Sequence, residues 1–409
     1  MPESLEAPPV ETAMRQRAAE IGALLQQTIE LLFAELGQRG ITDQRSLQTA
    51  FDLSQSATSR LVSAVRQGDP LATLSLIPGP EALQQMLRGA EAAGVAPARL
   101  RAAEEAVARL RAFLDIEVGN RGTLDALLVD WVQEARGSFE LRQKAAAFKA
   151  MSAIRGVQAQ TVMTTAIIHP SLQPGLCDSV GIDALLGCRR LRPSGVLRLS
   201  GVQMAAPEEV APFTALDGSP LQTMRDLLLA GFSSVAAERI ETARHGNQLE
   251  LTVRELPLGK GTEPGVDIVC SQLFRGSPRL QRGDGPPRAG AFGQAEPPCE
   301  HYVLDVLLHD DVWPGVQPEL HIFDTVVRGL AHADDPSRNG DRLDLLETVQ
   351  SLGRGADAFR LPQYPRYVEL VRHVCATLGW EPARLRGFRC KVRYPIYGSQ
   401  TALTFALAD

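Results

Sequence analysis

The sequence of 409 residues lacks any run of about 18 uninterrupted apolar residues. It begins with the acidic, proline-rich segment MPESLEAPPVET instead of basic residues followed by an apolar stretch. We therefore expect neither a membrane span nor a secretory signal. Lysine is also scarce, because 4 lysines stand among 42 basic residues. This arginine bias is typical of a GC-rich, bacterial genome.

Cysteine is present, but its spacing does not indicate a disulfide framework. The six cysteines form no Cys-X-X-Cys pair and have no regular spacing. Disulfide frameworks belong mainly to small secreted domains. We therefore expect reduced, mostly buried cysteines and a cytoplasmic protein.

An excess of positive charge is missing as well. The formal net charge is −6, and residues 1–140 contain 13 arginines, no lysine and 19 acidic residues. Non-specific binding of nucleic acid depends on cations that neutralise phosphates. This balance excludes a broad nucleic-acid surface, so any contact with DNA must be local.

Familiar catalytic signatures are absent too. The segment 259–262 is similar to part of a phosphate-binding loop, but Arg254 stands where the first glycine belongs and Gly261 where a hydroxyl should hold Mg²⁺. No GxGxxG, GxSxG, HExxH or EF-hand loop occurs. We therefore predict no catalytic residue, no metal ligand and no cofactor.

What the sequence does contain is the composition of a globular protein, with 44% hydrophobic and 22% charged residues. Its length predicts two domains. Apolar residues recur at helical spacing over 11–38, 81–93, 97–116 and 123–154. Residues 1–156 are therefore predicted to form an all-helical domain.

After Gly156 the pattern changes to short runs rich in Val, Ile and Thr. We expect strands at 157–168, 194–204, 249–255, 266–273, 301–308, 319–327, 388–395 and 401–407, and helices at 221–230, 343–352 and 364–378. The Gly/Pro/Arg-rich stretch 275–298 is interpreted as a disordered segment or a functional lid. This mixed order predicts an α+β domain over 157–409, with a mixed or antiparallel sheet that binds a ligand or partner.

One segment carries a functional hypothesis. Residues 46–65 read as a short helix, a tight turn at 52–54 and a second helix, together a helix-turn-helix within 46–67. Apolar residues of the second helix recur at Ala57, Leu61 and Val65, which leaves an acid-free polar face made of Gln55, Ser56, Ser59, Arg60 and Ser63. Such side chains can approach base edges in a major groove.

This segment resembles the helix-turn-helix regulators of the lambda-repressor-like kind, over about twenty residues from Ser46 to Val65. The resemblance implies that Gln55, Ser56, Ser59 and Arg60 contact bases or phosphates. The segment departs from the family pattern at Asp52, where glycine is usual in the turn, at Gln48 and at Thr58.

The hypothesis that follows is a DNA-binding transcriptional regulator whose C-terminal domain senses a ligand or partner. Paired recognition helices must reach two half-sites, so the helices at 11–39 and 97–117 are candidates for forming a homodimer, although packing within one chain explains them equally well. Two alternatives remain open. The helical hairpin could be an ordinary part of a bundle in a protein-binding adaptor, or the C-terminal domain could be an enzyme of unfamiliar type.

Two groups of residues bear on the enzyme alternative. If strands 301–308 and 319–327 are paired, His309 and Asp311 could converge with His321 on a divalent ion, whereas the plainer reading is a solvated turn. His301, Asp310 and Asp324 belong to the same group. Basic residues at 189–192 and 386–391 could bind an anion or balance nearby acids.

Overall fold

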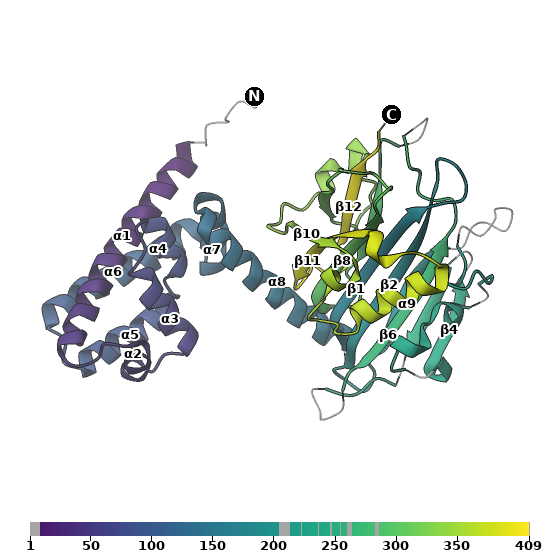
Figure 1. Cartoon of the computed structure of the whole chain (residues 1–409). Coiled ribbons are helices and arrows are strands. Elements are labelled where there is room, and N and C mark those ends of the chain that lie inside the picture. The colour runs from purple at the N-terminus through teal and green to yellow at the C-terminus, as the bar shows by residue number, and fades with distance from the viewer. Residues whose placement is uncertain are drawn as a thin grey trace. The chain divides into compact units, whose positions relative to one another are not determined.

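The computed structural model describes residues 9–203, 213–221, 223–235, 237–245, 248–253, 255–259, 264–282 and 286–408. The chain divides into two compact units, Met1–Arg142 and Gln143–Asp409, which we call the helical unit and the sheet unit (Figure 1). The predicted fold class, an all-helical region followed by a mixed α+β region, is confirmed. Among the described residues, none of the helices combines the length and apolar character needed to cross a lipid bilayer.

Short turns connect the helices of the helical unit. The helices are α1 (Pro9–Gln38), α2 (Gln44–Phe51), α3 (Gln55–Ala64), α4 (Pro70–Leu76), α5 (Pro80–Ala92), α6 (Pro97–Phe113) with a π-helical turn at Leu114–Val118, and α7 (Arg121–Trp131). The last helix, α8 (Gln133–Arg155), continues into the sheet unit. Local chemistry starts several of them, because the side chains of Asp43, Ser54, Asp69 and Asn120 each accept a hydrogen bond from the backbone N–H three residues later.

The core of the helical unit is apolar and closely packed. Leu25, Ile29, Leu61, Leu100 and Leu110 are among its buried members. The apolar stripe predicted over 97–116 packs inside the unit, where α6 contacts α1 and α5. This stripe, one of the two considered for a homodimer, is therefore largely covered by the chain itself.

Glycines allow two of these helix contacts. A Cβ on Gly22 of α1 would collide with the backbone of Pro70 at the start of α4, and one on Gly89 of α5 would collide with the backbone of Ala50 in α2. The close approach of these helices therefore requires residues without a side chain.

The sheet unit is built from twelve strands in the part of the chain that is described. They are β1 (Val157–Pro170), β2 (Cys177–Arg190), β3 (Leu197–Gln203), β4 (Ile240–His245), β5 (Gln248–Val253), β6 (Val266–Phe274), β7 (Arg288–Gln294), β8 (Cys299–His309), β9 (Glu319–Phe323), β10 (Val349–Arg354), β11 (Leu385–Arg393) and β12 (Gln400–Ala406). A six-stranded sheet has the order β10-β11-β8-β1-β2-β6, and two three-stranded sheets have the orders β7-β12-β9 and β3-β5-β4. The central pair β1 and β8 is parallel, and the other neighbours in the large sheet are antiparallel.

Apolar clusters cover both faces of the six-stranded sheet at its central strands β1 and β8. Helix α9 (Tyr367–Leu378) packs on one face, where its Tyr367, Leu370 and Val371 join Met163 and Ile167 of β1 in one cluster. Figure 1 shows α9 lying along this face. Apolar side chains of the two small sheets join the other cluster, together with Val162 and Ile168 of β1. Burial on both faces explains why residues 302–308 of β8 form an apolar run that only Asp305 interrupts.

Several sequence predictions in this unit need correction. Residues 343–352 do not form a helix, because 349–354 are strand β10. At 221–230 the described residues form 3-10 turns at Met224–Leu227 and from Ala230. The stretch 275–298 contains β7, and the strand expected at 319–327 ends at Phe323.

Strand β2 was not predicted at all, although it is 14 residues long and internal in the sheet. Gly181 and Gly187 interrupt its apolar pattern, and Asp183 stands between them. Glycine and aspartate are depleted in strands, so the local signal was weak.

All six cysteines are free and buried, as expected. Burial raises the pKa of all six thiols, to about 11 for Cys375, to about 12 for Cys177, Cys270 and Cys390, and further for Cys188 and Cys299. These thiols remain protonated at neutral pH and are poor nucleophiles.

Candidate functional site

Helices α2 and α3 are joined by a three-residue turn at Asp52, Leu53 and Ser54. Asp52 adopts the left-handed conformation, with φ 51° and ψ 40°, and its N–H donates to carbonyls of α2. This is the position where glycine is usual. Ser54 begins α3 by accepting a hydrogen bond from the N–H of Ala57 at 3.2 Å. The short helices and the tight turn expected from the sequence are therefore present.

The five residues expected on the outer face of α3 differ in exposure. Gln55 and Ser56, in the first turn, are exposed, whereas Ser59, Arg60 and Ser63 are half-buried. Helix α3 carries no acidic residue. The exposed polar surface is therefore concentrated at the N-terminal end of α3.

Arg60 reaches the end of α4. Its guanidinium donates to the carbonyls of Ser75 at 3.1 Å, Leu76 at 3.2 Å and Ile77 at 3.4 Å. Arg121 of α7 donates to the carbonyls of Leu74 and Ser75 at the same place. These carbonyls close the C-terminal end of α4, where the helix dipole favours cations. In this conformation Arg60 holds α3 against α4 instead of pointing outward.

The guanidinium groups of Arg60 and Arg121 are both partly shielded from solvent. Burial, and then the charges of Arg121 and Arg142, lower the pKa of Arg60. Burial likewise lowers the pKa of Arg121, against the opposing effect of Asp125, which accepts a hydrogen bond from Arg121 at 2.9 Å. Arg60 and Arg121 therefore join α3 and α7 to the C-terminal end of α4.

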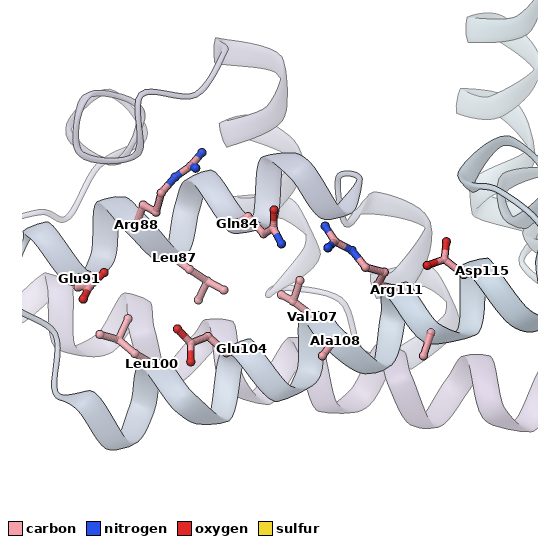
Figure 2. A pocket seen from close by; sticks show the side chains of 11 residues that line it. Gln84, Leu87, Arg88, Glu91, Leu100, Glu104, Val107, Ala108, Arg111 and Asp115 are labelled. Carbon is pink, nitrogen blue, oxygen red and sulfur yellow. The ribbon is translucent and has the colours of Figure 1, made fainter.

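A groove lies between α5 and α6 (Figure 2). Its volume is about 540 Å³, within the range of small-molecule sites. Leu87, Leu100 and Val107 form its apolar floor, and charged side chains line its margins: Arg88, Glu91, Glu104, Arg111 and Asp115. None of the five residues predicted to contact DNA lines this groove.

His321 does not join His309 and Asp311 in the metal site that was considered. Strand β8 lies between β11 and β1, while β9 pairs with β12 in another sheet. The pairing that a shared site at His309, Asp311 and His321 required is therefore absent. His321 instead contacts the hydroxyl of Thr404 at 3.1 Å. Among the described residues, no group of three or more His, Cys, Asp or Glu could hold a metal ion.

His309 has other neighbours, which the sequence did not indicate. It ends β8 beside His169 of the parallel strand β1, with 4.5 Å between ring centroids. Trp380 stacks on His169 at 4.8 Å. Nδ1 of His309 accepts a hydrogen bond from the N–H of Asp311, so its neutral form carries the proton on Nε2.

The electrostatic balance at His309 favours this neutral form. Burial, followed by the charges of His169 and Arg384, lowers the pKa of His309, and Asp311 and Asp310 oppose the shift only in part. A neutral histidine close to a second ring is compatible with proton transfer. In the described part of the chain, no third His, Cys, Asp or Glu completes a metal site at this position.

The basic segments mostly bind backbone carbonyls. Arg189 donates to Gly259, Arg190 to Pro193 and Arg192 to Ile154. Arg386 donates to the carbonyls of Val312, Trp313 and Val316. These guanidinium groups thus hold loops in place. The sequence had suggested two other roles for them, anion binding and balance of nearby acids.

A buried polar network crosses the α9 face of the sheet. Arg389 of β11 forms two hydrogen bonds with Asp305 of β8, at 2.8 and 2.7 Å, and Tyr367 of α9 donates to Asp305 at 2.7 Å. Burial opposes the charge of Arg389, but the hydrogen bonds and charge of Asp305 outweigh it and keep the pKa of Arg389 above its usual value. All three side chains are at least 95% buried, so this network is a structural tie.

Comparisons of the chain with protein-family models, with curated proteins and with solved structures gave no match. The similarity of residues 46–65 to lambda-repressor-like regulators therefore stands on those residues alone. The function has to be argued from side chains and their contacts.

Proposed function

We propose that the helical unit binds DNA through the N-terminal end of α3, and that the chain is a transcriptional regulator whose sheet unit responds to a ligand or partner. The observation that carries the proposal is the exposed, acid-free first turn of α3. Gln55 and Ser56 lie there in solvent, directly after the cap at Ser54. The amide of Gln55 can pair with adenine, and the positive end of the helix favours phosphate.

A rigid support favours this use of α3. The hydrogen bonds of Arg60 to the end of α4 fix the orientation of α3 in the helical unit. A recognition helix must be held at a defined angle by its neighbours to read base edges. Arg60 is therefore assigned as a positioning residue, and Gln55 and Ser56 as the contact residues. Ser59 and Ser63 are half-buried on the next turns, so they would contact only the edge of the DNA groove.

The acidic character of residues 1–140 sets the expected type of binding. Few cations are available to neutralise phosphates, so affinity for random DNA should be low and should depend on salt. Specific binding should show as enrichment of particular sequences. Dimerisation would strengthen it, through surfaces other than the α6 stripe that is covered inside the unit.

The test is a selection of genomic and random DNA fragments on the full chain, followed by binding measurements on the enriched fragments at two salt concentrations. The double variant Gln55→Glu/Ser56→Glu places two negative charges beside the phosphates and should abolish enrichment. Gln27→Glu/Ala34→Glu adds the same charge at exposed positions of α1 and should bind like the wild type. Absence of any salt-dependent, sequence-selective binding by the wild type would overturn the proposal.

A further inference from the structure

A carboxylate with no obvious structural task lies on the large sheet. Asp183 belongs to β2, which is internal between β1 and β6, and it aligns with Thr164 of β1 and Cys270 of β6. It is the only one of the 14 positions of β2 whose residue is exposed. Its face is opposite to the face that α9 covers, because Ile182 and Ala184 belong to the α9 cluster.

The charge of Asp183 is not balanced by the described part of the chain. Desolvation raises its pKa, and the only opposing effect is a hydrogen bond from Thr164. In that bond the hydroxyl of Thr164 donates to Oδ1 at 2.9 Å. No described arginine, lysine or histidine contributes to its pKa. A carboxylate that is partly desolvated without a cation costs free energy in the folded state, which is unusual for a purely structural residue.

A second observation at this place is an unsatisfied hydroxyl. Tyr302 of β8 is completely buried, and its hydroxyl has no hydrogen-bond partner. A Cβ on Gly293 of β7 would collide with this hydroxyl and with that of Thr164, so the two hydroxyls lie together under a glycine. Burial raises the pKa of Tyr302, the nearby hydroxyl of Thr164 opposes the rise in part, and the charge of Asp183 adds to it. Tyr302, Thr164 and Asp183 thus form one polar group that is incomplete in the chain itself.

The surface near Asp183 carries the amide of Gln272 and the ring of Phe274. Gly181 lies two residues away on the same face, and a Cβ there would be 3.2 Å from Nε2 of Gln272 and 3.6 Å from the ring of Phe274. Phe274 is half-buried and packs on Phe213, with 5.4 Å between centroids. A negative charge and an aromatic ring on the same face of a sheet, with a glycine between them, can together hold an organic cation.

We infer that Asp183, with Thr164 and the ring of Phe274, binds a small organic ammonium compound on this face of the sheet. Its charged nitrogen contacts the free oxygen of Asp183, and its aliphatic part lies over Gly181 toward Phe274. One carboxylate and a hydroxyl are too few ligands for a divalent metal, which agrees with the absence of a metal-binding group among the described residues. The inference does not depend on whether the helical unit binds DNA.

The experiment uses the full chain and n-butylamine as the cationic probe, with n-butanol as the neutral compound of the same shape. Butylamine should raise the midpoint of thermal unfolding and give saturable heat in titration calorimetry, and butanol should do neither. Asp183→Asn should weaken the binding of butylamine about tenfold or more, as expected for loss of a charged hydrogen bond. Asp357→Asn, which removes an exposed acid paired with Arg372, should leave the binding unchanged.

The wild type supplies an independent measurement if Asp183→Asn does not fold. Butylamine keeps its charge up to alkaline pH, so its affinity should rise with pH as Asp183 loses its proton. Equal binding of butylamine and butanol, equal binding by the wild type and Asp183→Asn, an affinity independent of pH, or no binding at all would each overturn the inference. DNA binding by α3 would be unaffected in every case.

Discussion

The two units satisfy their buried polar groups in different ways. In the helical unit Thr28 and Thr58 donate to the backbone four residues earlier, at Leu24 and Ser54, and Thr73 is the exception that reaches Gln26 and Ala64. In the sheet unit Asp305 bonds to Tyr367 and Arg389, which are 62 and 84 residues away in the sequence. The helical unit thus depends mainly on an apolar core and on bonds to backbone carbonyls, including those of Arg60 and Arg121, whereas the sheet unit also depends on a buried ion pair that only the fold brings together. The stability of the sheet unit should therefore respond more strongly than that of the helical unit to the loss of a single partner and to pH.

The largest effect is expected at the buried ion pair. Arg389→Met leaves Asp305 without its cation in the core, which should lower the free energy of unfolding of the sheet unit by about 3–5 kcal/mol. The measurement is denaturant unfolding of the full chain in a Trp131→Phe background. The remaining Trp313 and Trp380 then report on the sheet unit alone.

The matched control is Arg372→Met. Arg372 pairs with Asp357, and both side chains are more than half exposed. The loss should be about 1 kcal/mol or less, since exposed pairs are screened by water. Equal losses for Arg389→Met and Arg372→Met would show that burial of the pair is not what stabilises this unit.

A smaller effect is expected in the pH dependence of stability, which should differ between the two units. Burial is the first cause that lowers the pKa of His301, His309 and His321. The unfolded chain therefore binds more protons than the folded one, and the stability of the sheet unit should fall as pH drops through the ordinary histidine value of 6.5. The helical unit contains no histidine, so its unfolding should change little over the same window.

Unfolding at pH values on either side of this window distinguishes the units, with Trp131 as the reporter of the helical unit in a Trp313→Phe/Trp380→Phe background. His309→Gln should make the pH dependence of the sheet unit shallower, because one protonation step is removed. A steeper acid loss in the helical unit than in the sheet unit would contradict this account.

The smallest effect concerns the turn between α2 and α3. Asp52 has a positive φ of 51°, so Asp52→Gly should stabilise the helical unit by about 0.5 kcal/mol, the relief of left-handed strain less the entropy that glycine adds to the unfolded chain. Asp52→Ala, which keeps a Cβ without the side-chain oxygen, should destabilise it. The readout is the denaturant midpoint followed by Trp131. A loss of stability in Asp52→Gly would mean that the contact of Gln85 with the Asp52 carboxylate outweighs the strain.

The sequence by itself determined the helical unit well. Periodic apolar residues marked its helices except α4, which lies outside every predicted range, and Ser54 stands at the cap position before Gln55, because these signals act over three or four residues. It also determined the strands that are rich in Val and Ile, such as β1 and β8. The same local rules missed β2, where glycines and Asp183 break the pattern, and predicted a helix over β10.

Tertiary structure alone decided which side chains meet. From the sequence Arg60 belonged to the outer face of α3, yet the end of α4 offers it three carbonyls, and His309 meets His169 instead of His321 because β8 pairs with β1. The same holds for Asp305 with Arg389 and for Asp183 with Thr164. Strand order and helix packing set these contacts between residues far apart in the chain, and no pattern within a few residues records them.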